Sequence, residues 1–207
     1  MELHGHDSAA IIQFPPTSGY PRISVGSLHI LEELLAEVRA SGLFRCVVIA
    51  ASSRSFASGA EAREITALDP VSALEFARRG QNTFNTIAGF PLPVVAAIRG
   101  YCLGGGLDLA LACHARVATY DSTFGYPGAA LGLITGWGGT ERLSRLVGKA
   151  AALQLCLTGD RIPATQALTM GLVDELAPSQ DLIASAVKRA ENQWRVRSRR
   201  QAAGSDV

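Results

Sequence analysis

Three consecutive glycines followed by an acid form the segment best suited to chemistry. In GYCLGGGLDLALAC, residues 100–113, Asp108 stands two residues after the glycines at 104–106. The apolar run before the glycines predicts a strand, and the run after them predicts a helix. Glycines at a helix start let another group approach the backbone closely, and the first N–H groups of a helix have no partner inside it. The segment therefore favours a site that stabilises negative charge.

A second segment of similar character is FASGAE at 56–61, where Gly59 precedes another expected helix. Two such sites supply two backbone amides to one developing oxyanion, the usual arrangement for stabilising an enolate or a tetrahedral intermediate. Spacing alone leaves open that both are plain tight turns. Nucleotide motifs do not explain the glycines, because a G-x-G-x-x-G pattern counted from Gly104 ends on Leu109 and no Gly-Lys-Ser/Thr occurs.

Asp108 has two interpretations from the sequence. An acid in the first turn of a helix is favourable for purely local reasons, by about 0.3–1 kcal/mol. The helix dipole lowers the pKa of such a carboxyl, whereas burial in an apolar pocket raises it. A carboxylate that takes a proton or orients water, and one that only caps the helix, are both consistent with this position.

Composition excludes several classes of protein. The chain has 207 residues, 48% of them hydrophobic and 18% charged, with a net charge of +1. These values are typical of one globular domain and argue against a dedicated nucleic-acid binder. The basic cluster RVRSRRQ at 195–201 indicates a solvated, partly disordered tail rather than a binding patch. Since no signal core and no membrane-spanning apolar run occurs, we expect a cytoplasmic protein that does not bind membranes.

The cysteines and histidines show no metal-binding pattern. The four cysteines are widely scattered and three lie inside apolar runs, so buried thiols are expected. They are Cys46, Cys102, Cys113 and Cys156. No two histidines have the spacing of a ligand pair on a helix. We therefore predict neither a metal site nor a disulfide framework.

The elements that must position these residues alternate between strands and helices. Strands are predicted at 9–14, 45–52 and 94–100. Helices are predicted up to Gly42, at 70–89, from the glycines to about Cys113 and at 179–194. Helical segments are also predicted for GGTERLSRLVG, KAAALQLCLTG and PATQALTMG, the last with Pro163 in its first turn. This alternation predicts an α/β fold with largely parallel strand pairing.

Several collinear motifs resemble one known family. FASGAEAREI is similar to a loop of the enoyl-CoA hydratase/isomerase (crotonase) superfamily, usually written A-F-x-x-G-A-D-[IL]. VVAAIRGYCLGGGLDLALACHARVAT resembles the family's A-x-x-G-x-x-x-G-G-G-x-[ED]-L-A-x-x-C-D segment. The stretch that begins FGYPGAALGLITGWGGTERL is similar to the segment that follows it. The resemblance spans roughly residues 45 to 177.

The resemblance implies a Clp-protease-like spiral of repeated ββα units, assembled as trimers or dimers of trimers, with a coenzyme A thioester as ligand. It also implies that the amides of Ala60 and Gly105 form an oxyanion hole for the thioester carbonyl. The backbone at 58–63 would lie along the adenosine and pantetheine part of the ligand. The candidate substrate-binding residues are Ser58, Gly59, Glu61, Ala62, Arg63, Gly104, Tyr126, Gly128 and Trp137.

Only one of the family's two catalytic glutamates has a counterpart. The first aligns with Asp108, but the second aligns with Gly128 in FGYPGAALG, where the family pattern reads Phe-Gly-x-Pro-Glu. Without the second acid, activation of water loses a proton-handling group, a contribution of about 10²–10⁴-fold. Moving a proton between two carbons of a thioester needs one base, so isomerisation or another enolate reaction is favoured. Some naphthoate synthases also carry glycine here and use bicarbonate, which keeps that option open.

Tyr126, Thr135 and Trp137 flank this gap. Trp137 stands where relatives generally have a small residue, so it either narrows the acyl pocket or packs in the core. The chain also ends soon after GLVDEL, with one helix where typical members carry a longer helical region. We expect a crotonase-like core over 1–178 and a C-terminal helix and tail over 179–207.

The combined expectation is an acyl-CoA enzyme of the hydratase or isomerase type in fatty acid metabolism. It would have Asp108 as its only protein base and no cofactor. The alternative is a weak or non-catalytic acyl-CoA-binding or assembly subunit, because Gly128 replaces the second glutamate. Serine hydrolysis of the Clp-protease type is disfavoured, since CLGGGLDLA supplies no serine near the oxyanion helix.

Overall fold

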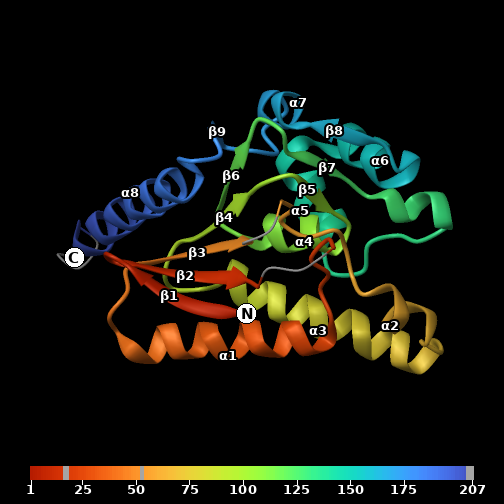
Figure 1. Ribbon diagram of the computed structural model, residues 1–207, viewed down its shortest axis with the longest axis horizontal. Coiled ribbons are helices and arrows are strands. Elements are labelled where there is room, and N and C mark those ends of the chain that lie inside the picture. Colours follow the sequence, from red (N-terminus) through yellow and green to blue (C-terminus); the bar gives the residue numbers. More distant parts are fainter. Residues whose placement is uncertain (16–18, 52–53, 204–207) are drawn as a thin grey trace.

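The structure is a computed structural model that describes residues 1–15, 19–51 and 54–203 (Figure 1). Within these residues the main sheet has six strands in the order β1-β2-β3-β4-β6-β9. They are β1 (Glu2–His6), β2 (Ala9–Phe14), β3 (Cys46–Ala51), β4 (Val94–Ile98), β6 (Ala115–Thr119) and β9 (Glu175–Ala177). The β1–β2 pair is antiparallel and the other neighbours are parallel. The predicted α/β fold with largely parallel pairing is confirmed.

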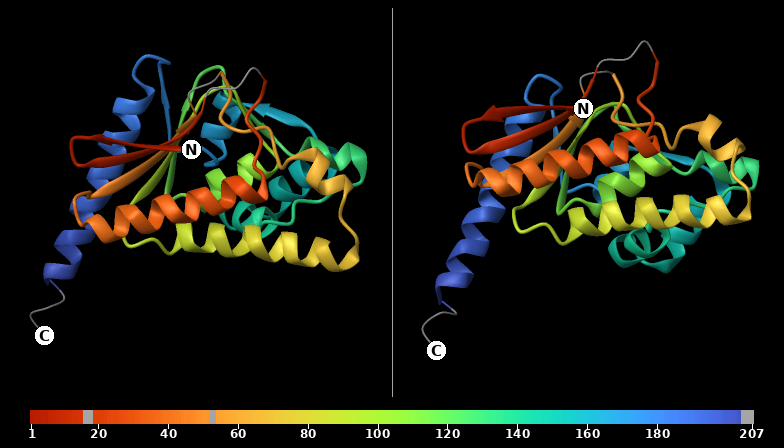
Figure 2. Two further views of the ribbon diagram at one scale, coloured as in Figure 1. Left: turned by 60° about the horizontal axis from the view of Figure 1, so that its bottom comes forward. Right: turned by 90° about the horizontal axis from the view of Figure 1, so that it is seen from below.

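Helices cover both faces of this sheet. They are α1 (Val25–Ser41), α3 (Pro70–Ala88), α4 (Gly105–Ala112) and α8 (Leu182–Ala203). Val47 and Ile49 of β3 pack into the core beneath α1, α3 and α4. Cys46 and Val48 of the same strand pack on the opposite face, under α8. Figure 2 shows α1 and α3 side by side on one side of the sheet and α8 on the other. Burial of both faces explains why the central strands are continuous apolar runs.

A smaller sheet gives the fold its repeated unit. In the described residues it has three strands, β5 (Tyr101–Leu103), β7 (Thr123–Gly125) and β8 (Arg161–Pro163). Strands β4 and β5 lead into α4, and β6 and β7 lead through the short 3-10 helix η1 (Pro127–Leu131) toward α5 (Gly139–Val147). The first strand of each unit joins the main sheet and the second joins the smaller one. This repetition is the expected spiral of ββα units.

The pairing of β5 with β7 matters for the site. The two strands are parallel, with Leu103 opposite Gly125. The chain after β5 enters α4 through Gly104, and the chain after β7 enters η1 through Tyr126. The two segments that resemble the family's acid-bearing motifs therefore leave the small sheet at the same edge.

Helix α1 illustrates how local signals set an element. Its capping box joins Ser24 and Ser27, and Gly42 ends it with a left-handed φ of 63°. The apolar stripe predicted from the sequence faces the core, since its buried residues are Leu28, Leu31, Leu35 and Val38. Helix α3 begins in the same way, with Asp69 capping a first turn that starts with Pro70.

Four elements differ from the prediction. Strands β1 and β8 were not expected. Pro163 ends β8 and caps α7 (Ala164–Thr169) from outside, rather than lying in its first turn. Helix α8 does not end near residue 194 but continues to Ala203, so the cluster at 195–201 is helical and the expectation of a disordered tail there is wrong. Residues 204–207 of the expected tail lie outside the described residues.

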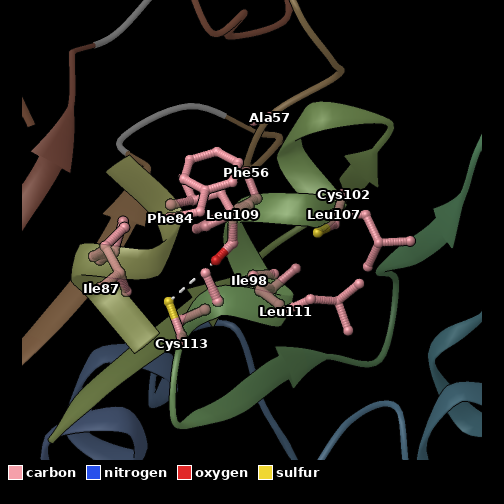
Figure 3. Close-up of a cluster of buried hydrophobic side chains, with 14 of the residues drawn as sticks. Phe56, Ala57, Phe84, Ile87, Ile98, Cys102, Leu107, Leu109, Leu111 and Cys113 are labelled. Atoms are coloured by element: carbon pink, nitrogen blue, oxygen red, sulfur yellow. Dashed lines mark hydrogen bonds between the residues drawn. The ribbon is translucent and has the colours of Figure 1, made fainter. Parts of the chain in front are cut away.

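Buried side chains of the core pack against helix α4. Figure 3 shows Phe56, Phe84 and Leu109 packed together, and the Cys113 thiol donates to the Leu109 carbonyl at 3.4 Å. All four cysteines are buried and free, as expected, and burial raises the pKa of the Cys113 thiol to about 12. No helix in the described part of the chain is long and apolar enough to cross a membrane.

Candidate active site

Two glycine-containing segments meet at the start of α4. The Leu103 N–H donates to the Ala57 carbonyl at 2.9 Å, which holds the 56–60 loop along β5. A Cβ added to Gly104 would lie 3.4 Å from the Cα of Gly59. One added to Gly106 would overlap the Ala57 carbonyl and lie 2.7 Å from its Cβ. The glycines are therefore explained by close backbone approach rather than by plain turns.

The amides of Ala60 and Gly105 lie close together, and each lacks a backbone partner in the described part of the chain. A Cβ on Gly105 would come within 3.4 Å of the Ala60 nitrogen. Both sides of Ala60 are held, because the Ile23 N–H donates to Gly59 and the Glu61 N–H donates to Ile23, each at 2.9 Å. Within the described residues, neither the Ala60 nor the Gly105 N–H donates to another backbone group. Such amides, with α4 behind one of them, are suited to stabilise a developing negative charge.

A cavity of about 440 Å³ opens onto these amides. Ten of the residues predicted for the site line it: Ser58, Gly59, Ala60, Ala62, Gly104, Gly105, Asp108, Tyr126, Gly128 and Trp137. Two predicted substrate-binding residues do not line it. Glu61 caps α2 (Ala62–Thr66) by accepting from the Arg63 N–H, and the Arg63 side chain is exposed on that helix.

Asp108 is buried beneath this cavity, with only 1% of its surface exposed. The Tyr126 hydroxyl donates to its Oδ1 at 2.7 Å, and the Thr135 hydroxyl donates to its Oδ2. Burial raises the pKa of the Asp108 carboxyl from 3.8 to about 6, an effect that the two hydroxyls and the positive charge of Arg142 only partly offset. The carboxyl is thus ionised at neutral pH but holds a proton more readily than an exposed aspartate.

The start of α5 closes over the same carboxyl. A Cβ at Gly139 would overlap both Asp108 Oδ1 and the Tyr126 hydroxyl oxygen, and it would lie 3.0 Å from Asp108 Cγ. Arg142 of the same helix donates to the Trp137 carbonyl at 3.0 Å and to the Asn85 side chain at 2.6 Å, which ties α5 to α3. Three segments of the chain, at Tyr126, Thr135 and Gly139, therefore surround the Asp108 carboxyl.

Gly128 lies on η1 and lines the cavity without a side chain. A Cβ there would make only ordinary contacts, 3.5 Å from Leu133 Cβ and 3.9 Å from the Leu133 carbonyl oxygen. A side chain at this position could therefore begin without a clash. The hydroxyls of Tyr126 and Thr135, which line the same cavity, already donate to Asp108.

Both interpretations of Trp137, as a core residue and as part of the pocket wall, agree with its position. It is 3% exposed and packs against Phe76 and Phe84, with ring centroids 5.1 and 5.6 Å away. It also lines the cavity, and its six-membered ring lies against Gly105. The side chain is therefore part of the core and part of the cavity wall.

Sequence reasoning missed most of the apolar cavity wall. Ile65 of α2, Phe76 of α3 and Leu68 between these helices line one side of it, and Leu131, Leu133 and Ile134 line the other side. These residues carry no motif, and their periodicity indicates only packing. Arg22 also lines the cavity and is exposed. The donation from Thr135 to Asp108 had no sequence signal, because 27 residues separate them.

Comparisons with known proteins agree with this geometry. The sequence profile of the enoyl-CoA hydratase/isomerase family matches residues 23–203. The fatty acid oxidation complex subunit alpha of Shewanella loihica is 46% identical over 165 residues, which are 76% of this chain and 23% of that protein. The chain therefore spans about a quarter of the length of that relative.

Solved structures agree with the fold. An enoyl-CoA hydratase from Bacillus anthracis has a TM-score of 0.86 at 30% identity, covering 92% of this chain and 75% of that one. An enoyl-CoA hydratase from Thermoplasma volcanium has a TM-score of 0.87 at 28% identity, covering 94% and 77%. The profile match includes both glycine segments and Asp108. The chain has the crotonase fold and belongs to the enoyl-CoA hydratase/isomerase family.

Proposed function

We propose that this protein forms the enolate of an acyl-CoA thioester, with the Ala60 and Gly105 amides as the oxyanion hole. The observation that carries the proposal is the convergence of two amides at an apolar cavity, both without a backbone acceptor among the residues that the structure describes. A thioester oxygen that accepts from both gains stabilisation mainly when it becomes negative, which lowers the barrier to enolate formation. The relative from Shewanella loihica, a fatty acid oxidation subunit, supports a fatty acyl group.

Asp108 acts as the base in this proposal. Its carboxylate removes a proton from C2 of a 3-enoyl thioester, and the electron pair moves into the carbonyl held by the two amides. The protonated carboxyl then returns the proton at C4, and the double bond ends between C2 and C3. A pKa of about 6 suits a group that must both accept and return a proton near neutral pH.

Gly128 directs the reaction toward isomerisation rather than hydration. Addition of water to a 2-enoyl thioester requires a second group to handle the proton of water, and the side chain that would do this is absent at Gly128. The hydroxyls of Tyr126 and Thr135 both donate to Asp108, and that of Ser58 donates to the Pro21 carbonyl. We therefore propose that the protein isomerises 3-enoyl thioesters faster than it hydrates 2-enoyl thioesters, without bicarbonate.

The experiment compares two substrates and two proteins. Turnover of 3-octenoyl-CoA and of 2-octenoyl-CoA is measured for the wild type and for Asp108→Asn, with and without added bicarbonate. The proposal predicts isomerisation that exceeds hydration, that is lost in the variant and that does not respond to bicarbonate. Isomerisation unchanged in Asp108→Asn would remove this residue from the mechanism.

A non-catalytic acyl-CoA-binding subunit is the second candidate, and Gly128 is the observation that favours it. Isothermal titration with octanoyl-CoA separates the two. Binding without turnover of either enoyl thioester supports the binding subunit. Absence of binding contradicts both candidates.

Assembly is a separate proposal. The resemblance to trimeric relatives favours a trimer, and the cavity mouth carries apolar side chains, with Leu131 78% and Ile134 66% exposed. A neighbouring subunit that covered this loop would remove it from water. Sedimentation velocity at several concentrations tests the trimer, and a monomer at every concentration would contradict it.

A further inference from the structure

We propose that Trp137, seated in a slot formed by Gly80 and Gly105, restricts the ligand to thioesters whose acyl group is unbranched beside the carbonyl. This inference rests on the proposed function, because it takes the Gly105 amide as a carbonyl-binding group. It deepens that function by naming the acyl class. The Trp137 side chain becomes a determinant of specificity rather than only a member of the core.

The slot exists only because both of its walls are glycine. A Cβ on Gly80 of α3 would overlap the indole, lying 2.5 Å from Trp137 Cγ. A Cβ on Gly105 of α4 would lie 2.5 Å from Cζ3 and 2.8 Å from Cε3 of the same ring. The indole therefore fills the space between the two helices.

Gly80 has no other evident role in α3. Glycine is unfavourable in the interior of a helix, and this residue is buried midway along a helix of 19 residues. The contact with Trp137 accounts for it. The indole is further fixed by donation from Nε1 to the Phe76 carbonyl at 3.2 Å and by edge contact with Phe84.

The position of the ring decides which part of an acyl group it meets. Its Cζ3 and Cε3 edge lies against Gly105, beside the amide that would hold the thioester oxygen. A branch on C2 or C3 of the acyl chain must occupy space near that edge. The ring is anchored on both sides and cannot retreat toward α3, so branching near the carbonyl is excluded.

The rest of the cavity favours an apolar chain. Its walls are Ile65, Leu68 and Phe76 on one side and Leu131, Leu133 and Ile134 on the other. An unbranched, apolar acyl group therefore fits both the space beside Trp137 and these walls.

The test uses binding, so that it does not depend on turnover. Affinities for octanoyl-CoA, 2-methyloctanoyl-CoA and benzoyl-CoA are measured by isothermal titration for the wild type and for Trp137→Leu. We expect the wild type to prefer octanoyl-CoA at least about tenfold over the two bulkier thioesters. Trp137→Leu opens the space beside Gly105 and should reduce this preference to about twofold or less. An unchanged preference in the folded variant overturns the proposal.

A paired variant guards against a general loss of packing. Gly80→Ala places a methyl group where the indole lies, so alone it should displace the ring and weaken binding of octanoyl-CoA. Combined with Trp137→Leu, the same methyl group enters the space that the indole has left and should restore the fold. If Trp137→Leu does not fold, the double variant and Trp137→Phe are titrated instead. Equal ligand preference in all folded forms overturns the proposal.

Fluorescence gives a direct reading of the contact. The chain has two tryptophans, so Trp194→Phe leaves Trp137 as the only one, and octanoyl-CoA should change its emission with the affinity found by titration. Binding with unaltered emission overturns the inference while the proposed function stands. A response without turnover contradicts catalysis and supports the inference. If the wild type binds no acyl-CoA, both fail.

Discussion

The two halves of the candidate site are built differently. The oxyanion half consists of backbone, where the loop ending at Ala60 meets the start of α4 at Gly105. The acid half depends mainly on side chains, with Asp108 held by hydroxyls from Tyr126 and Thr135 and with Gly128 lining the same cavity. The first half depends on close chain approach that few residues tolerate. The second half changes with a single residue.

This difference indicates which half of the site determines the type of reaction. A Cβ at Gly106 would overlap the Ala57 backbone, so the oxyanion half leaves little freedom for substitution. A Cβ at Gly128 would meet nothing closer than 3.5 Å, so the acid half accepts a new side chain. In the proposed reaction, enolate stabilisation would depend on backbone that the fold fixes, whereas the fate of the enolate would depend on the groups around Asp108.

The largest expected effect comes from a substitution that changes only the acid half of the site. Asp108→Asn keeps the shape and one of the two hydrogen-bond acceptors but removes the base, so isomerisation of 3-octenoyl-CoA should fall by about 10²–10⁴-fold. Binding of octanoyl-CoA should change little, because the oxyanion half is intact. Steady-state kinetics and titration calorimetry check the two statements, and equal losses in both would contradict the division of the site.

The same substitution should raise stability above pH 6. Because the pKa of Asp108 is raised from 3.8 to about 6, the folded protein retains a proton that the unfolded chain has already released. The wild type therefore loses up to about 3 kcal/mol of unfolding free energy from this group as pH rises through that range. Urea unfolding should show that the free energy of unfolding of Asp108→Asn exceeds that of the wild type at pH 7.5 but not at pH 4. An equal difference at both values would contradict the raised pKa.

Restoring the missing acid should shift the reaction. Gly128→Glu places a carboxylate where the structure has room for a side chain, and hydration of 2-octenoyl-CoA should rise by about tenfold or more. Ala129→Glu is the matched control, since it adds the same charge one residue away. Product analysis by chromatography distinguishes the two reactions. An equal gain from both variants would indicate a charge effect and not a specific site.

The smallest expected effect comes from removing one of the two hydroxyls that donate to Asp108. Tyr126→Phe removes a donor to Oδ1 of the ionised Asp108, so the pKa of this carboxyl should rise by about one further unit. Activity should then fall more at pH 6 than at pH 8. The pH profile of kcat/KM measures this, with Thr135→Val as the comparison for Oδ2. A uniform loss at every pH would indicate only structural damage.

Much of the fold could be predicted because its signals are local. The stripe of α1 and the apolar runs of β3 and β4 each point to one structure, and the glycines mark the backbone approach. Strand β1 was missed because its residues are almost all exposed and show no alternation. Helix α8 was predicted too short because a charged segment can be helical as well as disordered.

The residues of the site could be predicted better than their contacts. The glycines suggested two amide sites and the family resemblance named Ala60, Gly105 and Asp108, but the hydroxyl partners of Asp108 come from residues 18 and 27 positions further along the chain. Whether burial or the helix dipole controls the pKa of this acid depends on packing around it, and burial has the greater effect. The role of Trp137 depends on Gly80, a residue with no motif around it.

Exchange of the C2 proton with solvent reports enolate formation whatever reaction follows it. The protein is incubated with 3-octenoyl-CoA in D₂O, and deuterium uptake at C2 and C4 is followed by NMR. We expect uptake at both carbons in the wild type and none above background in Asp108→Asn, with thioester binding retained. Binding without any exchange in the wild type would contradict this expectation.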